Sequence, residues 1–138
     1  MKVRFEKVAV PCVINDVVTW HLAHGFVWDV VEESGRRIGV FYCTRMCGDG
    51  NFIHFFSVDG IKISPATVLY TFRKAIRMMS NVGVVLAAVS ENKKGLLRVL
   101  SRLGMKEIPG GDYFRDGEKI LLLKYFEGEK SILRDINH

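Results

Sequence analysis

The chain has 138 residues, of which 49% are hydrophobic and 25% are charged, a composition typical of one compact globular domain. No apolar run approaches the roughly 20 residues of a membrane span, and residues 1–6 alternate like a strand without the apolar core of a signal peptide. These features argue against a membrane or secreted protein. We interpret the protein as cytoplasmic and expect no membrane partner.

The formal net charge of +5 is compatible with a polyanionic partner or with solubility alone. No arginine-rich run or nucleic-acid motif accompanies the charge, so we do not expect nucleic acid as a partner. The odd count of three cysteines predicts reduced thiols. Cys43, Cys47 and His54 could in principle meet at a zinc ion, but their spacing matches no common zinc module. We expect ordinary packing there and no metal site.

The first part of the chain predicts antiparallel strands and one short helix. Residues 2–10 alternate and predict the first strand. A short helix follows, capped by Asn15 or Asp16 and running through Leu22 or Ala23. His21 and His24 could share a face of that helix, and we interpret them as exposed or cap-adjacent rather than as a metal pair. Residues 26–32 and 37–44 then predict a hairpin with a glycine-containing turn.

The central part of the chain predicts a β-α-β unit. Residues 52–58 form a strand, with Phe52, His54, Phe56 and Val58 on one face and Ile53, Phe55 and Ser57 on the other. Ser64 and Pro65 start a helix over residues 64–81, in which Val68, Leu69, Phe72, Ile76 and Met79 form one apolar stripe. Residues 84–89 form a continuous apolar strand. A helical crossover makes the two strands parallel. Ligands of such units usually bind where the strands end and the helices begin.

The last part of the chain predicts a helix over residues 93–103 capped by Asn92, with Leu96, Leu97, Leu100 and Leu103 on an apolar stripe that faces the core. A hairpin of residues 112–115 and 118–126 around Asp116-Gly117 follows. The fold class is therefore α/β, a mixed sheet of about seven strands with helices on both faces. Residues 1–127 form a single domain, and residues 128–138 form a charged tail.

The order β-α-β-β-β-α-β-α-β-β resembles the GNAT (N-acetyltransferase) superfamily over nearly the whole chain. The most specific segment is residues 98–105 (RVLSRLGM), which resembles the family's "FYEKLGF" helix end. The resemblance implies that acetyl-CoA binds in a V-shaped opening between two central parallel strands. It also implies acetyl transfer to an amine of a small molecule or a protein.

The resemblance places the cofactor by position. The strand backbone from Phe56 to Val58 would pair with the pantetheine arm, and the start of the following helix would hold the pyrophosphate. The residues expected at the pyrophosphate are Ile63, Ser64, Ala66 and Thr67, with Asn92 and Lys93 reaching the cofactor from the second parallel strand.

Two family features differ in this chain. The phosphate loop of the family contains glycines that let backbone amides approach the anion, whereas residues 61–67 contain none and Pro65 has no N–H. The tyrosine that many members use as a general acid falls at about Leu100. His54 is the candidate base because its strand position could face the cleft, and a packed structural histidine is the other interpretation. Tyr70, Glu91 and Tyr113 are alternatives with no stronger support.

Short motifs also resemble GNAT-like proteins of tailed phages, such as the internal core protein of short-tailed coliphages, which also has a degenerate phosphate loop. The motifs are Cys47-Gly48-Asp49, Phe72-Arg73-Lys74, Arg98-x-Leu100 with Gly104, and Tyr113-x-Arg115-Asp116-Gly117. This resemblance implies an alternative function: a catalytically inactive GNAT-fold protein, located in the virion, that binds a phage or host protein.

Overall fold

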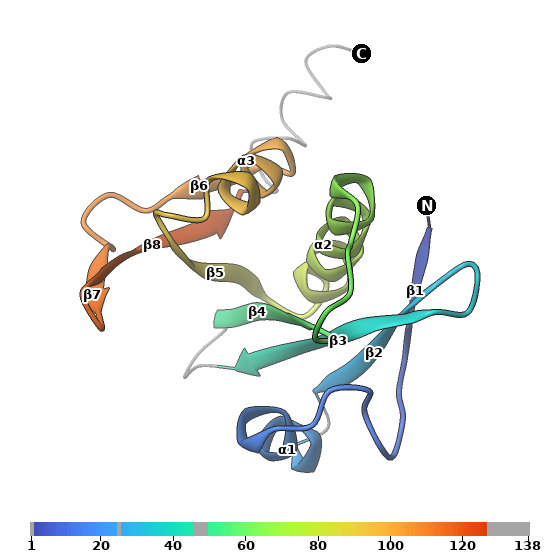
Figure 1. Cartoon of the computed structure of the whole chain (residues 1–138). Helices are drawn as coiled ribbons and strands as arrows, with labels where there is room; N and C mark the ends of the chain where they lie inside the picture. Colours follow the sequence, from blue (N-terminus) through green and yellow to red (C-terminus); the bar gives the residue numbers. More distant parts are fainter. Residues whose placement is uncertain (1, 25, 46–49, 127–138) are drawn as a thin grey trace.

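In the computed structural model, residues 2–24, 26–45 and 50–126 are described. They form one sheet of eight strands and three helices that pack on it (Figure 1). The elements are β1 (Val3–Glu6), α1 (Asp16–Ala23), β2 (Val27–Glu32), β3 (Arg37–Arg45), β4 (Gly50–Ser57), α2 (Pro65–Ser80), β5 (Val84–Ser90), α3 (Lys94–Arg102), β6 (Met105–Glu107), β7 (Tyr113–Arg115) and β8 (Glu118–Tyr125).

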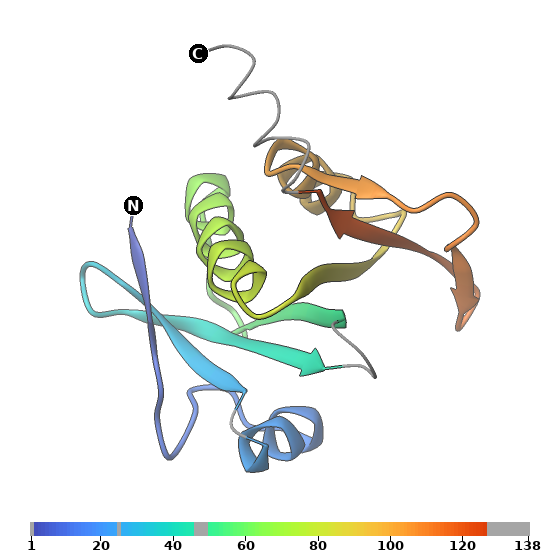
Figure 2. The same ribbon diagram turned by 180° about the vertical axis from the view of Figure 1, so that it is seen from behind.

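The strand order in the sheet is β1-β2-β3-β4-β5-β8-β6, with β7 pairing β8. The pair β4–β5 is parallel, and the other pairs are antiparallel. Helix α1 covers one face of the sheet, and α2 and α3 cover the other (Figures 1 and 2). The prediction of a mixed sheet with adjacent parallel β4 and β5 and with helices on both faces is therefore confirmed.

The main hydrophobic core lies between the sheet and the helices α2 and α3. The apolar stripe of α2 places Phe72, Ile76 and Met79 in this core, and α3 contributes Leu100, which is fully buried. Helical spacing brings such residues onto one face. The stripes predicted for both helices are confirmed.

The start of α2 also matches its prediction. Ser64 is the N-cap, its hydroxyl oxygen accepts the Thr67 N–H at 3.1 Å, and Pro65 occupies the first turn. The Asp116-Gly117 turn is confirmed as well, since both residues have positive φ (51° and 79°) as a tight hairpin turn requires.

Four details differ from the sequence prediction. The first strand ends at Glu6, where its pairing with β2 stops at Asp29, and the chain then turns so that the Cys12 N–H donates to the Asp29 carboxylate. Strand β6 adds an eighth strand, since its three residues pair with the distant β8. Asn92 does not cap α3; the N-cap is Lys93, without a side-chain hydrogen bond.

The fourth difference is His21, which is buried (6% exposed) rather than exposed. Its Nδ1 donates to the Val17 carbonyl at 2.7 Å, and its Nε2 lies 2.8 Å from Thr44 Oγ1. The contact with β3 thus fixes α1 against the sheet. His24 is the C-cap residue of α1, as a cap-adjacent position predicts.

None of the helices among the described residues is long and apolar enough to cross a membrane. The predicted C-terminal tail, residues 128–138, lies outside the described part of the chain.

Candidate functional site

Strands β4 and β5 separate after a short stretch of pairing. Their parallel register joins only Gly50–Val84, Asn51–Val85 and Phe52–Leu86. Beyond these pairs β4 remains bonded to β3 as far as Ser57, and β5 remains bonded to β8 as far as Ser90. The sheet therefore opens as a V between its two halves, which Figure 1 shows as the diverging β4 and β5 ribbons.

The backbone groups that face this opening follow from the hydrogen bonds on the outer sides of the two strands. The Val58 N–H donates to the Ile38 carbonyl at 2.9 Å, so even-numbered residues of β4 point their N–H and C=O groups toward β3. The odd-numbered residues Phe55 and Ser57 therefore point theirs into the opening. The Glu91 N–H donates to the Lys119 carbonyl at 3.0 Å, and by the same alternation Ala88 on β5 faces the opening from the other side.

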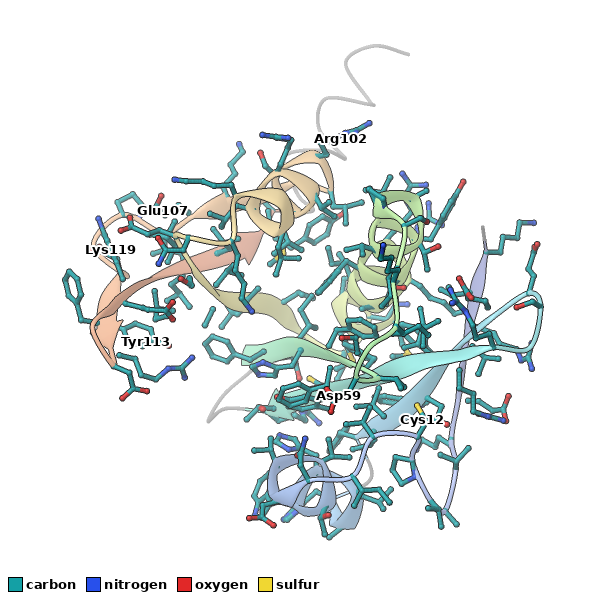
Figure 3. All side chains as sticks on the ribbon, in the orientation of Figure 1. Cys12, Asp59, Arg102, Glu107, Tyr113 and Lys119 are labelled. Atoms are coloured by element: carbon teal, nitrogen blue, oxygen red, sulfur yellow. The ribbon has the colours of Figure 1, made fainter. Side chains whose placement is uncertain are left out.

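A hollow of about 570 Å³ adjoins the opening on the α1 face of the sheet. Its walls come from α1, β3, β4, β5 and the β7–β8 hairpin. Tyr113 reaches it from that hairpin, at the end of the sheet farthest from β1 (Figure 3). The lining residues are Val17, His21, Tyr42, Thr44, Phe52, His54, Phe56, Ala88, Tyr113 and Arg115.

The alternation predicted for β4 is confirmed at this hollow. Phe52, His54 and Phe56 line it, whereas Ile53 and Phe55 face the core under α2. Val58 follows the strand and is not part of the wall.

His54 stacks on Tyr42, with ring centroids 4.6 Å apart and planes 14° from parallel. Burial, with smaller contributions from His21 and Arg115, lowers the pKa of His54 to about 4. Burial also raises the pKa of the Tyr42 hydroxyl. At neutral pH His54 is therefore an uncharged imidazole within the hollow, packed on one side and facing the cavity on the other. His54 therefore fits both interpretations: its ring packs against Tyr42, and it also lines the hollow.

The other predicted site residues lie around the opening. Ala66, Asn92 and Lys93 are exposed, Ser64 and Ile63 are half-buried, and Thr67 is buried (1% exposed). The Thr67 N–H already donates to Ser64, and Pro65 has none. Of the first three amides of α2, only that of Ala66 is left for an anion. The Thr67 N–H is thus part of the helix cap.

The start of α3 is less obstructed. No side chain caps it, and Lys93 and Lys94 lie at its first residues. The space around Gly95 is open, since a Cβ placed there would meet no atom within 4 Å. A helix start with unpaired amides and two neighbouring ammonium groups favours a phosphate.

The positions of the other candidate acid, base and metal-ligating residues distinguish among them. Tyr70 lies on the outer face of α2, away from the hollow, whereas Tyr113 lines it. Leu100 is fully buried in the core, so that position supplies no acid. Cys43 faces the core on the α2 side, opposite His54, so these two do not converge on a metal; Cys47 lies outside the described residues. Within the described ranges no group of three His, Cys, Asp or Glu side chains could hold a metal ion.

The sequence interpretation missed the wall residues Tyr42, Thr44 and Arg115. Tyr42 and Thr44 pair across the strands with His54 and Phe52, so the hairpin alternation contained a signal for them. Arg115 had no such signal, because its place depends on how β8 crosses the sheet.

No family model and no curated protein matches this chain. Solved structures do match. Spermidine N-acetyltransferase from Vibrio cholerae, in complex with CoA and spermine, has 10% identity and a TM-score of 0.65 over 82% of this chain and 73% of that one. RimJ from Mycobacterium smegmatis, in complex with CoA-disulfide, has 16% identity and a TM-score of 0.62 over 82% of this chain. A GNAT-family acetyltransferase from Bacillus anthracis has 12% identity and a TM-score of 0.58, with 82% and 72% of the two chains covered.

The fold is therefore that of the GNAT acetyltransferases. The chain is shorter than some of these neighbours. It spans 59% of the RimJ chain and 64% of a GNAT-family protein from Bordetella pertussis that also matches.

Proposed function

We propose that this protein is an acetyl-CoA-dependent N-acetyltransferase of the GNAT type. The observation that carries the proposal is the parting of β4 from β5 after three residue pairs. It leaves two strand edges with backbone groups unpaired by the sheet, directly beside a hollow of about 570 Å³. An extended amide-bearing chain such as pantetheine can hydrogen-bond along such an edge, and an acceptor can enter from the hollow.

The geometry refines the residues for the cofactor. The pantetheine would pair with the backbone of Phe55 and Ser57 rather than with that of Phe56 and Val58, because the Val58 N–H is bonded to β3. Ile63, Ser64 and Ala66 would border the pyrophosphate at α2, and Asn92 and Lys93 would border it at α3. Since α2 offers few amides, the charge of Lys93 and Lys94 would supply much of the attraction for phosphate.

Acetyl-CoA supplies the acetyl thioester: a C–N bond to the amine forms, the C–S bond breaks, and one amine proton ends on the CoA sulfur. The N–H groups of β4 that face the opening would hydrogen-bond to the carbonyl oxygen, where negative charge develops. The walls of the hollow would hold the amine near the carbonyl carbon.

His54 is the residue in the hollow best placed to help the amine lose its proton. Its imidazole is neutral above a pKa of about 4, so one ring nitrogen keeps a free lone pair at neutral pH. That nitrogen can accept a hydrogen bond from the amine and orient its lone pair. Tyr113 would offer a hydroxyl from the opposite wall of the hollow.

Calorimetric titration of the purified chain with acetyl-CoA tests the proposal. We expect saturable micromolar binding, weakened roughly 10- to 100-fold in Lys93→Ala, the scale of one charge-assisted hydrogen bond. Lys2→Ala, at the far edge of the sheet, is the matched control and should bind like the wild type. Release of CoA thiol with an amine present then reports transfer.

The alternative is a GNAT-fold binding protein without transferase activity, such as a phage component that binds a phage or host protein. The observation in its favour is the start of α2, where Pro65 and the Ser64–Thr67 cap leave few amides for phosphate. It predicts no saturable binding of acetyl-CoA at millimolar concentration by protein shown to be folded, and no effect of Lys93→Ala.

A further inference from the structure

The wall of the hollow on the β3 and β4 side is a row of stacked rings. Tyr42 stacks on His54 at 4.6 Å and on Phe56 at 5.5 Å, with planes within 21° of parallel. Phe56 is 38% exposed, and Tyr113 on the other wall is 41% exposed. Exposed aromatic faces that line a cavity gain free energy when a planar apolar group covers them.

Arg115 brings a positive charge to the same cavity. Its guanidinium is close enough to contribute to the lowered pKa of His54 and to oppose the raised pKa of Tyr42. No carboxylate among the described residues forms an ion pair with it, and none of the described lining residues is acidic. The planar guanidinium group of Arg115 is therefore available to a carboxylate, which it can bind through two parallel hydrogen bonds.

The same charge disfavours a polycation. A polyamine such as spermidine would have to leave water beside Arg115, and the described walls offer it no countercharge. Like charges repel each other, and a cation that enters the hollow without a countercharge gives up part of its hydration. The aromatic wall therefore favours an acceptor with a planar apolar group, and the Arg115 guanidinium favours an acceptor with a negative charge.

We propose that the acceptor is an amine that carries a planar aromatic group and a carboxylate, an aromatic amino acid being the simplest example. The aromatic group would lie against the exposed ring of Phe56, the carboxylate against Arg115, and the amine toward the opening between β4 and β5. A cavity of about 570 Å³ is large enough for such a molecule. This inference rests on the proposed acetyl transfer.

The experiment measures CoA thiol release with four amines and compares kcat/KM per neutral amine. L-Phenylalanine has both groups, phenethylamine lacks the carboxylate, L-alanine lacks the ring, and spermidine is a polycation. We expect phenylalanine to be preferred about tenfold or more over phenethylamine and over alanine, with spermidine lowest.

The variant Arg115→Gln should lower the preference for phenylalanine over phenethylamine by roughly 10- to 100-fold, the scale of a charge-assisted pair. Arg77→Gln, an exposed position on the opposite face of the sheet, should leave that preference unchanged.

The outcomes separate the two proposals. Absence of acetyl-CoA binding overturns the transferase and the acceptor class with it. Binding of acetyl-CoA together with a preference for spermidine, or with no transfer to any of the four amines, overturns the acceptor class alone. An equal loss for phenylalanine and phenethylamine in Arg115→Gln also overturns it, because the arginine would then have no role specific to the carboxylate.

Discussion

The two faces of β4 differ in what covers them. Ile53 and Phe55 point toward α2 and join a closed core, whereas Phe52, His54 and Phe56 point toward α1 and border an open hollow. The short helix α1 packs mainly on β2 and β3, while α2 packs over β5, β4 and β1. One strand thus contributes to stability through one face and to the candidate site through the other. Substitutions on the two faces should therefore separate stability from activity.

The largest effect is expected on the closed face. Leu100→Ala should lower the free energy of unfolding by about 2–5 kcal/mol, because it leaves a cavity in a fully buried position. Phe56→Ala, on the open face, should cost only about 1 kcal/mol while reducing acetyl transfer. Denaturant unfolding and thiol release measure the two quantities. A loss below about half a kcal/mol for Leu100→Ala would contradict its place in the core.

The next largest change in stability is expected at Gly39, which tests how tightly the closed face is packed; Gly95 serves as its comparison. A Cβ at Gly39 would lie 2.2 Å from the Phe56 carbonyl oxygen and 2.8 Å from the Phe55 ring. Gly39→Ala should therefore destabilise the fold by about 1–3 kcal/mol. Gly95→Ala meets nothing within 4 Å and should stabilise the helix by about 0.5–1 kcal/mol. Thermal unfolding of the two variants side by side should give shifts of opposite sign.

The pH dependence of stability should report the hollow through His54. Its pKa is about 4 in the folded chain and about 6.5 when unfolded. Between these values the unfolded state binds more protons, so stability is lost as the pH falls from 6.5 to 4. We expect His54 to contribute about 1–3 kcal/mol of this loss, discounted for its partial exposure.

His54→Gln should flatten the stability curve in that window relative to the wild type, and measurement of unfolding free energy at pH 7.5, 5.5 and 4 checks it. Identical curves for the two proteins would show that His54 is solvated as in the unfolded chain. That result would argue against its place in the wall of the hollow.

Local signals in the sequence were sufficient where a structure forms among neighbouring residues. The cap at Ser64, the turn at Asp116-Gly117 and the apolar stripe that includes Leu100 were predicted because hydrogen bonds and helical spacing within a few residues decide them. The parallel pairing of β4 and β5 was predictable too, since a helical crossover of this length has one common geometry.

The sequence failed where a competing local hydrogen bond or a contact with a distant segment decided the structure. The cap expected at Asn92 did not form; its backbone N–H instead donates to Ser90 Oγ at 3.3 Å. The strand expected beyond Glu6 ended because the chain turns away there, and the Cys12 N–H instead donates to the carboxylate of Asp29, 17 residues away. His21 was interpreted as exposed, but β3 supplies Thr44 to its ring from 23 residues away, and no local pattern encodes that contact.

The sequence by itself determined the order of the elements apart from β6, the faces of β4 and the absence of an N–H at Pro65, because these depend on residue identity and spacing along one segment. Only the tertiary structure decided the rest. The short pairing of β4 with β5 opens the V between them. The insertion of β8 between β5 and β6 brings the β7–β8 hairpin, with Arg115, to the hollow that α1 borders on its other side. Such contacts depend on how strands from distant parts of the chain share hydrogen bonds, and that sharing is settled only when the whole sheet assembles.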